Sequence, residues 1–332
     1  MTLPLEYPIE PMEARSVESL PEGKGWQYEP KWDGFRCVAW RDGRTVRLQS
    51  KAGKPLDRYF PDIGETVAGL GASRSVLDGE VVIRVGRRLS FDALLLRVHP
   101  AASRVRKLVA EHRARFEVFD LLVDERGRSL VELPLADRRE RLERFAERYF
   151  TNPDEIALST ATTSLATARK WLAGGKGDLD GVMAKRVDCP YRAGERDAMV
   201  KVKRQRTADC VVGGFRYASN GGKVGSLLLG LYDDEGLLNH VGFTSSMPAA
   251  ERADMTAKLK RLVEPPGFTG RAPGGPSRWS TERSSEWEPL RPELVVEVAY
   301  DHVSGGRFRH GTRFLRWRPD KAPAQCTQAQ LG

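Results

Sequence analysis

The segment Lys31-Trp32-Asp33-Gly34-Phe35-Arg36 decides the fold of the first part of this 332-residue chain. Strand-like runs flank it at residues 26–30 and 35–40. Asp-Gly pairs favour tight reversals between strands, so the pattern predicts an antiparallel sheet with Lys31 near its mouth. A single lysine beside an Asp-Gly pair is usually a solvated surface residue, and the downstream sequence has to decide whether this one is reactive.

Further hairpin and helix signals extend this pattern. Asp42-Gly43 joins two strand-like runs within residues 40–46, and Asp78-Gly79 repeats the theme within residues 75–83. Helical periodicity predicts helices over residues 137–150 and 164–172, and further strands at 180–185 and 199–203. Residues 9–20 have apolar side chains near helical spacing but are too few to be more than a packing element.

The last part of the chain begins after a polar stretch, residues 204–207, which predicts a hinge and a domain boundary near residue 205. Strand-like runs follow at 210–215, 225–231, 294–300 and 312–318, with an amphipathic helix at 248–263 and a Pro/Gly-rich loop at 265–276. About five strands and one helix suit an OB-type barrel.

Composition sets the protein class. The chain is 40% hydrophobic and 30% charged, with a net charge of +9 and a pI near 9.5, so it can bury a sizeable core and favours polyanionic partners. Its four cysteines form no C-x-x-C pair, which argues against a structural zinc site. We find no signal peptide and no apolar run of membrane-spanning length, and therefore expect a cytoplasmic protein without membrane contact.

Seven short segments rich in Lys, Arg, Asp, Glu and Gly follow one another in a fixed order. They are Lys31-Trp32-Asp33-Gly34-Phe35-Arg36, Ser50-Lys51-Ala52-Gly53, Asp78-Gly79-Glu80, Phe119-Asp120, Asp180-Gly181-Val182-Met183-Ala184-Lys185, Lys201-Val202-Lys203 and Arg316-Trp317-Arg318-Pro319-Asp320-Lys321. This series resembles the nucleotidyl motifs of the covalent nucleotidyltransferases. The last two segments look most like those of compact bacterial ATP-dependent DNA ligases of the Ligase C type, and the resemblance covers essentially the whole chain.

The resemblance implies an α+β fold. An antiparallel-sheet nucleotidyltransferase (adenylation) domain at residues 1–204 would be followed by an OB-fold β-barrel domain at 205–332. It also implies ATP-dependent sealing of 5′-phosphate/3′-hydroxyl nicks in duplex DNA through a lysyl-AMP intermediate, in DNA repair. RNA ligases and capping guanylyltransferases share Lys-x-Asp-Gly and the barrel, so they stay open as alternatives. A basic OB-fold protein that only binds nucleic acid is the non-enzyme alternative.

The chemistry of the series centres on Lys31, the candidate for the adenylated residue. Attack on the α-phosphorus of ATP needs an unprotonated amine, and neighbouring cations and a metal ion disfavour the ammonium form. Lys185, Lys201 and Lys203 can supply positive charge. Lys201 and Lys203 are two apart on a predicted strand and therefore share a face; by resemblance they contact the nucleotide phosphates, with Lys203 nearest the α-phosphate.

Two carboxylates are candidate ligands for Mg²⁺ or Mn²⁺, because such ions prefer hard oxygen donors. These are Glu80 and Asp180; the family commonly has glutamate at the second position, one methylene longer. The resemblance gives Glu80 and Arg36 ribose-side or metal roles and makes Phe119 the aromatic that stacks on adenine, although its apolar neighbours also allow a core position. Glu29 would read the adenine amino group.

The remaining candidates concern DNA. Lys51 stands where the family usually has an arginine that grips the nick phosphate, and Arg316 is a second phosphate contact. The ending with Arg318 and Lys321 would swing onto the nucleotide and then withdraw, by resemblance. Only thirty residues precede Lys31, so we expect no clamp domain there, weak nick affinity and a monomer on nicked duplex DNA. No docking motif identifies a repair polymerase partner.

Overall fold

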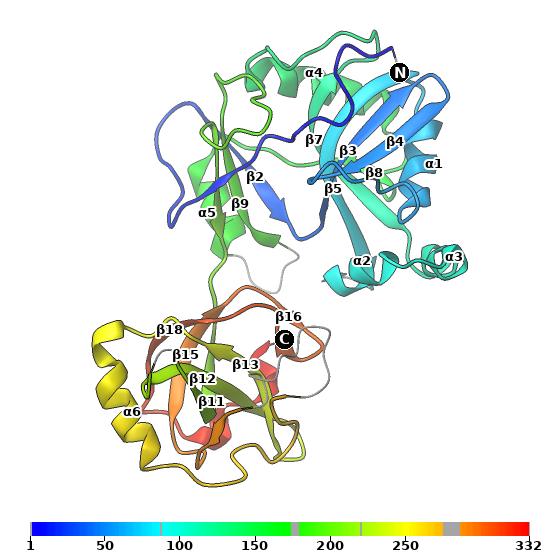
Figure 1. Ribbon diagram of the computed structural model, residues 1–332. Helices are drawn as coiled ribbons and strands as arrows, with labels where there is room; N and C mark the ends of the chain where they lie inside the picture. The colour runs from blue at the N-terminus through cyan, green and yellow to red at the C-terminus, as the bar shows by residue number, and fades with distance from the viewer. Residues whose placement is uncertain (1, 87, 174–178, 220, 275–285, 332) are drawn as a thin grey trace. The chain divides into compact units, whose positions relative to one another are not determined.

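The structure is a computed structural model that describes residues 2–86, 88–173, 179–219, 221–274 and 286–331. It divides into two compact units, Met1–Arg204 and Gln205–Gly332 (Figure 1). Each unit has its own hydrophobic core. Within the described ranges, no helix is long and apolar enough to cross a membrane.

The first unit contains two β-sheets. The larger sheet has the strand order β4-β3-β5-β7-β8, with β6 beside β5, and the smaller sheet has the order β1-β10-β9-β2. Neighbouring strands are antiparallel except for β1 with β10 and β7 with β8. The strands are β1 Arg15–Ser16, β2 Trp26–Trp32, β3 Phe35–Asp42, β4 Thr45–Ser50, β5 Arg74–Val85, β6 Arg88–Leu89, β7 Ala114–Val123, β8 Ile156–Leu158, β9 Leu179–Arg186 and β10 Met199–Lys203.

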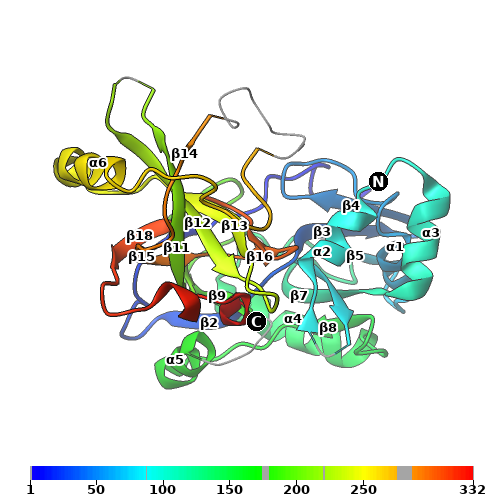
Figure 2. The ribbon, with the colours of Figure 1, turned by 90° about the horizontal axis from the view of Figure 1, so that it is seen from below.

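Helices cover the sheets of this unit (Figure 2). Buried residues of two helices, Ile63 of α1 and Leu142 and Phe145 of α4, join one face of the larger sheet in a single core. Trp40 and Met12 belong to a separate core on the other side, and α5 packs on the smaller sheet. The helices are α1 Pro61–Gly69, α2 Phe91–Arg97, α3 Ala102–Glu111, α4 Leu135–Tyr149 and α5 Leu165–Ala173.

The prediction of a hairpin at Asp33-Gly34 was wrong. Strand β2 pairs with β9 in the smaller sheet, whereas β3 pairs with β4 and β5 in the larger one. The Asp33-Gly34 pair therefore carries the chain from one sheet to the other. A side chain at Gly34 would collide with the carbonyl oxygen of Val81 and with Glu80, so glycine is needed for close approach to β5.

The turn expected at Asp78-Gly79 is also absent, and Asp180-Gly181 is not a turn either. Both glycines are inside continuous strands, Gly79 in β5 and Gly181 in β9. A Cβ atom at Gly79 would overlap Phe116 and the carbonyl oxygen of Glu117, and one at Gly181 would overlap the carbonyl oxygen of Val202. Tight strand-to-strand packing, which local sequence does not reveal, explains these glycines.

Two further elements differ from expectation. Residues 9–20 are extended rather than helical, and β1 within them pairs in parallel with β10, Ser16 opposite Lys201. The helix predicted at 248–263 is shorter: a 3₁₀ turn, Ala249–Glu251, leads into α6, Arg252–Lys260. The remaining predicted helices were confirmed closely as α4 and α5, and Ser164 caps α5 by accepting a hydrogen bond from the amide of Thr167.

The second unit is a sheet with the order β13-β12-β11-β15-β18, to which β14 adds beside β11 and β16-β17 forms a separate hairpin. Thr244 and Thr312 form a bridge that connects the two ends of this order, and the Thr244 hydroxyl donates to the Thr312 carbonyl at 2.9 Å. This arrangement fits the expected OB-type barrel. The strands are β11 Arg206–Tyr217, β12 Val224–Tyr232, β13 Leu238–Thr244, β14 Glu288–Pro289, β15 Val295–Tyr300, β16 Val303–Ser304, β17 Arg307–Phe308 and β18 Arg313–Trp317.

Candidate active site

A cavity of about 180 Å³ in the first unit is lined by residues of both sheets and of the N-terminal segment. It brings together most of the first unit's candidates from the sequence, namely Glu29, Lys31, Arg36, Lys51, Glu80, Phe119, Lys185 and Lys201. These residues come from β2, β3, β5, β7, β9 and β10, and Lys51 follows β4. Six of the seven segments therefore converge on one place, because six strands end or pass there, whereas the seventh belongs to the second unit.

Lys31 lies near the end of β2, opposite Gly181 of β9. Its Nζ forms an ion pair with a carboxylate oxygen of Asp180, whose side chain is buried, while the Lys31 side chain keeps 22% of its surface exposed. The pairing of β2 with β9 sets this contact, since it places the residue before Gly181 next to the amine. The amine is therefore held in position and is still accessible from the cavity.

Phe119 borders the same cavity and is flanked by two cations. The Lys185 Nζ lies 4.4 Å from the ring centroid and the Arg36 Cζ lies 4.7 Å from it. Lys185 also forms a buried ion pair with Glu29 at 2.7 Å, and the Gln27 amide donates to the other oxygen of Glu29. Phe119 is partly exposed, unlike its buried neighbours on β7, so it is a cavity residue and not a core residue.

Arg36 is held by a network that the sequence did not indicate. Its guanidinium donates twice to Asp78, at 2.6 and 2.5 Å, and once to the Met12 carbonyl at 3.3 Å. The Tyr191 hydroxyl donates to Asp78 at 2.6 Å and accepts from the Met12 amide at 3.1 Å. Burial disfavours the charged form of Arg36, but Asp78 outweighs this and raises the pKa of the guanidinium.

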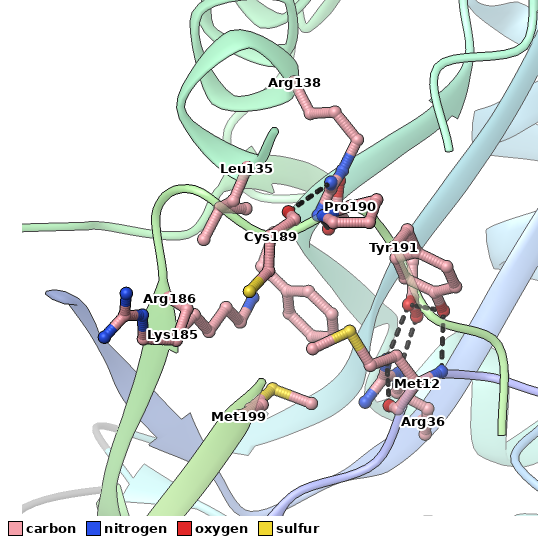
Figure 3. Close-up of a pocket in the computed structure, with 13 residues that line it drawn as sticks. Met12, Arg36, Leu135, Arg138, Lys185, Arg186, Cys189, Pro190, Tyr191 and Met199 are labelled. Carbon is pink, nitrogen blue, oxygen red and sulfur yellow. Dashed lines mark hydrogen bonds and ion pairs between the residues drawn. The ribbon is translucent and has the colours of Figure 1, made fainter. Parts of the chain in front are cut away.

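Figure 3 shows this network around a second, nearly filled cavity of about 10 Å³ that adjoins the first. Tyr191, Arg36 and Met12 meet on one side of it, and Arg138 reaches in from α4 toward the Cys189 carbonyl at 3.3 Å. Arg138 also forms two hydrogen bonds of 2.9 Å with Asp120. The wall behind Phe119 is thus packed and hydrogen-bonded.

The electrostatics of the main cavity are dominated by crowded charges. Burial raises the pKa of Glu80 to about 7, with Asp78 and Asp33 adding to the effect while Arg36 and Lys31 oppose it. Burial also lowers the pKa of Lys201, helped by the nearby positive charges of Lys31, Lys51 and Lys203. A carboxylate and an amine are each less readily ionised here than in water, as is common where ions or charged ligands bind.

The lysines beyond Lys31 have different surroundings. Lys51 is 57% exposed and pairs with Glu13 at 3.0 Å, and Glu13 also binds Arg196 at 2.7 Å. On β10, Val200 and Val202 are buried, whereas Lys201 is partly exposed and Lys203 is exposed, as the alternation predicted. Lys201 lines the cavity; Lys203 is outside its lining.

A metal ion would have to share its ligands with substrate. Among the residues that the structure describes, no group of three or more His, Cys, Asp or Glu side chains could hold an ion alone. Glu80 and Asp180 both lie near Lys31. Asp180 forms an ion pair with the Lys31 amine, and the positive charge of Lys31 acts to lower the pKa of Glu80. Two carboxylates completed by phosphate oxygens and water are the usual protein environment of Mg²⁺.

The C-terminal candidates belong to the second unit and are tied to acidic residues there. Arg318 contacts Asp209 at 2.8 Å and Asp320 at 2.8 Å, and the Lys321 Nζ contacts Asp209 at 2.9 Å. Hydrogen bonding to Arg318 lowers the pKa of Asp320 to about 2. Arg316 pairs with Glu297 at 2.7 Å. Asp209, on β11, organises this ending.

Several residues around the site were missed by sequence reasoning. Met183 and Met199 line the cavity, and Met12 reaches it from the N-terminal segment. Asp78 stands in a quoted motif, two residues before Glu80. The β3–β5 pairing puts Arg36 opposite Glu80 and therefore close to Asp78, so the motif offered a signal for this partner. Tyr191 has no local signal, because its partners are far away in sequence.

Comparisons with known proteins show the family. The family model described as ATP dependent DNA ligase domain matches residues 11–203, and the one described as ATP dependent DNA ligase C terminal region matches residues 220–321. The chain is 45% identical to DNA ligase C1 of Mycolicibacterium smegmatis and 41% identical to DNA ligase C of Mycobacterium tuberculosis; both alignments cover 100% of this chain and 96% of the relative.

A solved structure extends the agreement to the fold. The chain superposes on a structure titled "DNA binding with a minimal scaffold: Structure-function analysis of Lig E DNA ligases" with a TM-score of 0.54 and 17% identity, covering 92% of this chain and 100% of that one. The expected α+β fold with an OB-type second unit is confirmed. With most motif residues of its first unit gathered around the Lys31 cavity and its whole length matched, the chain belongs to the ATP-dependent DNA ligases, as a compact bacterial member.

Proposed function

We propose that this ligase seals nicks between a 5′-phosphate and a 3′-hydroxyl in duplex DNA, with Lys31 as the residue that carries AMP from ATP to DNA. The observation behind the proposal is the cavity in which the accessible Lys31 amine lies among Arg36, Lys185 and Lys201. Phosphoryl transfer asks mainly for positioned reactants and neutralised charge. A lysine in a cation-rich cavity supplies both.

In the first step the Lys31 Nζ loses a proton and attacks the α-phosphorus of ATP. The N–P bond forms, the P–O bond to the β-phosphate breaks, and pyrophosphate leaves. The proton must go first, because an ammonium group has no free electron pair. Asp180 is the partner of that amine and is our candidate to receive the proton.

In the second step an oxygen of the nick's 5′-phosphate attacks the adenylate phosphorus. The N–P bond breaks, which regenerates the Lys31 amine and leaves AMP joined to the DNA end. In the third step the 3′-hydroxyl attacks the 5′-phosphorus, loses its proton, and displaces AMP. All three steps displace a group at phosphorus, so the same positive charges can serve each of them.

The other candidates receive roles around the nucleotide. Phe119 would stack on adenine and Glu29 would read its amino group, since both border the cavity beside Lys31. Arg36 would bind the ribose side. Lys185, Lys201 and Lys203 would neutralise the phosphates; their positive charge is the property that the transfer needs.

Mg²⁺ or Mn²⁺ is proposed as the companion of ATP, with Glu80 and Asp180 as protein ligands. The support is electrostatic: Glu80 is destabilised as an anion by burial and by Asp78 and Asp33, and a divalent cation would relieve that. When bound, such an ion neutralises phosphate charge. The protein side chains would orient it next to the attacking amine.

The two units would divide the work. We propose that residues 1–204 form the adenylation domain and residues 205–332 the OB-fold domain that completes the DNA contact. Lys51 and Arg316 would bind phosphates of the nicked strand, and Arg318 and Lys321 would orient the pyrophosphate leaving group. All four side chains are positively charged and are exposed or partly exposed to solvent, as contact with phosphates requires.

We further propose that the enzyme acts as a monomer in the cytoplasm, in DNA repair. One chain supplies every role assigned above. Nicks with a 5′-phosphate and a 3′-hydroxyl are the chemical ends that a repair synthesis step would hand to a ligase. Among the residues that the structure describes, no surface feature selects a polymerase partner.

The test is covalent labelling. Protein is incubated with α-labelled ATP and Mg²⁺, and its intact mass is measured; the mass should rise by one adenylate, and Lys31→Ala should abolish the rise. Lys54→Ala, an exposed lysine outside the cavity lining, is the control and should label normally. Labelling that survives in Lys31→Ala would refute the assignment. GTP as a better donor, or sealing of nicked RNA but not nicked DNA, would point to the related transferases instead.

A further inference from the structure

The first unit has a third and larger cavity of about 360 Å³, formed between the turn after β7 and one face of α4. None of its lining residues also lines the main cavity around Lys31. Leu121, Phe145 and Tyr149 form its apolar floor, and five arginines surround it: Arg126, Arg128, Arg141, Arg144 and Arg148. We call this the arginine cavity.

The arginines are brought together by two separate elements. On α4, Arg141, Arg144 and Arg148 follow one another at spacings of three and four, so they project from one face of the helix. The turn after β7 supplies Arg126 and Arg128. The opposite edge of that helix face is closed by Phe145, whose ring packs against Tyr149 with centroids 4.8 Å apart.

One buried carboxylate builds the turn. Asp124 accepts hydrogen bonds from the backbone amides of Arg126 and Arg128, at 3.0 and 2.9 Å, and from the Arg128 side chain at 2.8 Å. It lies 3.9 Å from Arg141. The Asp124 carboxylate is therefore already engaged with the turn and with Arg128 and Arg141, the two arginines nearest to it.

The other three arginines direct their charge outward. Side-chain exposure is 72% for Arg126 and 66% for Arg144, whose partners Glu125 and Glu140 are themselves surface residues at 3.9 and 3.1 Å. Arg148 is exposed and lies with its Cζ 5.3 Å from the Tyr149 ring centroid. Five arginines against two acids, Asp124 and Glu125, leave the cavity lining with a formal charge of +3.

We infer that the arginine cavity binds the phosphodiester backbone of DNA at a place separate from the nick. Arginine forks match phosphate oxygens with two hydrogen bonds, and aromatic floors beside arginines suit sugars and bases next to those phosphates. A peptide rich in carboxylates would satisfy the charge but gives no reason for the aromatic floor. The inference rests on the proposed DNA-ligase function and adds to it a second contact for the same class of substrate.

The DNA backbone bound in the arginine cavity can come from two sources with the same chemistry. The phosphates can belong to the flank of the nicked duplex itself, or to a separate DNA segment held at the same time. A contact with the flank needs a duplex long enough to reach from the nick to the arginine cavity. A separate segment needs no such length, but it can be removed by competition with unnicked DNA.

The experiment uses the full-length protein with Arg144→Gln and Arg148→Gln combined. These two side chains are exposed, make no contact with Asp124, and are replaced by another good helix former. The matched control is Arg104→Gln with Arg106→Gln, which removes the same charge from exposed positions on α3, outside both cavities. Binding of nicked duplexes with short and long flanks is measured by fluorescence anisotropy over a range of salt concentrations.

We expect the cavity variant to bind at least one duplex roughly tenfold more weakly near 0.1 M salt, with a salt slope smaller by about one or two phosphate contacts. A loss confined to the long duplex assigns the flank. A loss with both lengths, together with lost competition by unnicked DNA, assigns a separate segment. Labelling of the variant by ATP should remain normal, which keeps this test independent of the one for Lys31.

Three results would overturn the inference. The first is wild-type DNA binding by the cavity variant, and the second is an equal loss in the Arg104/Arg106 control, which would mean that only total charge matters. The third is a synthetic polyglutamate peptide that binds wild-type protein but not the cavity variant while DNA binding is unchanged. That result would assign the arginine cavity to an acidic protein partner.

Discussion

At the scale of single residues, the site consists of oppositely charged side chains that form ion pairs with each other in the absence of substrate. Lys31 is paired with Asp180 and Lys185 with Glu29. The Glu29–Lys185 pair is nearly inaccessible to water, with side-chain exposures of 2% and 7%. Removing one member of such a pair leaves the other charge buried without compensation, which costs far more than the pair itself contributes. Mutations at these positions will therefore affect folding as well as catalysis.

The variant Glu29→Gln tests this point. It leaves the Lys185 ammonium buried without its counter-ion, and we expect the first unit to lose about 3 kcal/mol of stability, seen as a calorimetric transition lowered by roughly 6–12 °C. Adding Lys185→Met should recover most of the loss, because the unpaired charge disappears. A double variant as unstable as Glu29→Gln would contradict the account.

At the scale of elements, the active site depends on a segment and a loop with no motif of their own. The N-terminal segment brings Met12, and the loop between β9 and β10 brings Tyr191, which joins them to Asp78 of β5. Through Asp78 this network holds Arg36 against Phe119. Tyr191 is thus a positioning residue that acts through Arg36.

We expect Tyr191→Phe to raise the KM for ATP in self-adenylation by about three- to tenfold while the maximal rate changes little, since one hydrogen-bonded hydroxyl contributes roughly 1 kcal/mol and touches no reacting atom. Tyr59→Phe is the control, because the Tyr59 hydroxyl makes no hydrogen bond to another described residue. An unchanged KM, or a fall in the maximal rate alone, would remove Tyr191 from this role.

At the scale of the whole molecule, the C-terminal ending is held within the second unit by Asp209. Arg318 and Lys321 both contact its carboxylate, and hydrogen bonding to Asp209 raises the pKa of Lys321. If these two cations serve the nucleotide in the first step, as proposed, they must first leave Asp209. Asp209 then sets how readily the ending is released.

Asp209→Asn should therefore speed self-adenylation by about fivefold or more, because it removes two partly buried ion pairs and even one exposed pair is worth up to about 1 kcal/mol. Rapid-quench measurement of the labelled adduct gives the rate. Glu264→Gln, which removes a surface charge that faces Arg291 in the same unit, serves as the control. Slower adenylation in Asp209→Asn would show that the ion pairs assist the first step and would reverse the interpretation.

Much of the fold could be predicted from local pattern. The strand runs, the helices α4 and α5 and the alternation of Lys201 and Lys203 with buried valines were confirmed, because periodicity and capping depend on neighbours in the chain. The predicted hairpin at Asp42-Gly43 was confirmed, since it joins β3 to β4. Asp33-Gly34 and Asp78-Gly79 misled the prediction, because a glycine needed for close contact between strands looks the same in sequence as a glycine needed for a turn.

The amino-acid order alone established the reactive residue types, their succession along the chain and the division of labour that we propose for them. Folding decided the partners: Lys31 with Asp180, Arg36 with Asp78 and Tyr191, Arg318 with Asp209, and the five arginines around one cavity. The physical reason is distance. Side-chain chemistry is a property of each residue, whereas a contact between residues more than a hundred positions apart, such as Tyr191 and Asp78, exists only after the strands have been packed together.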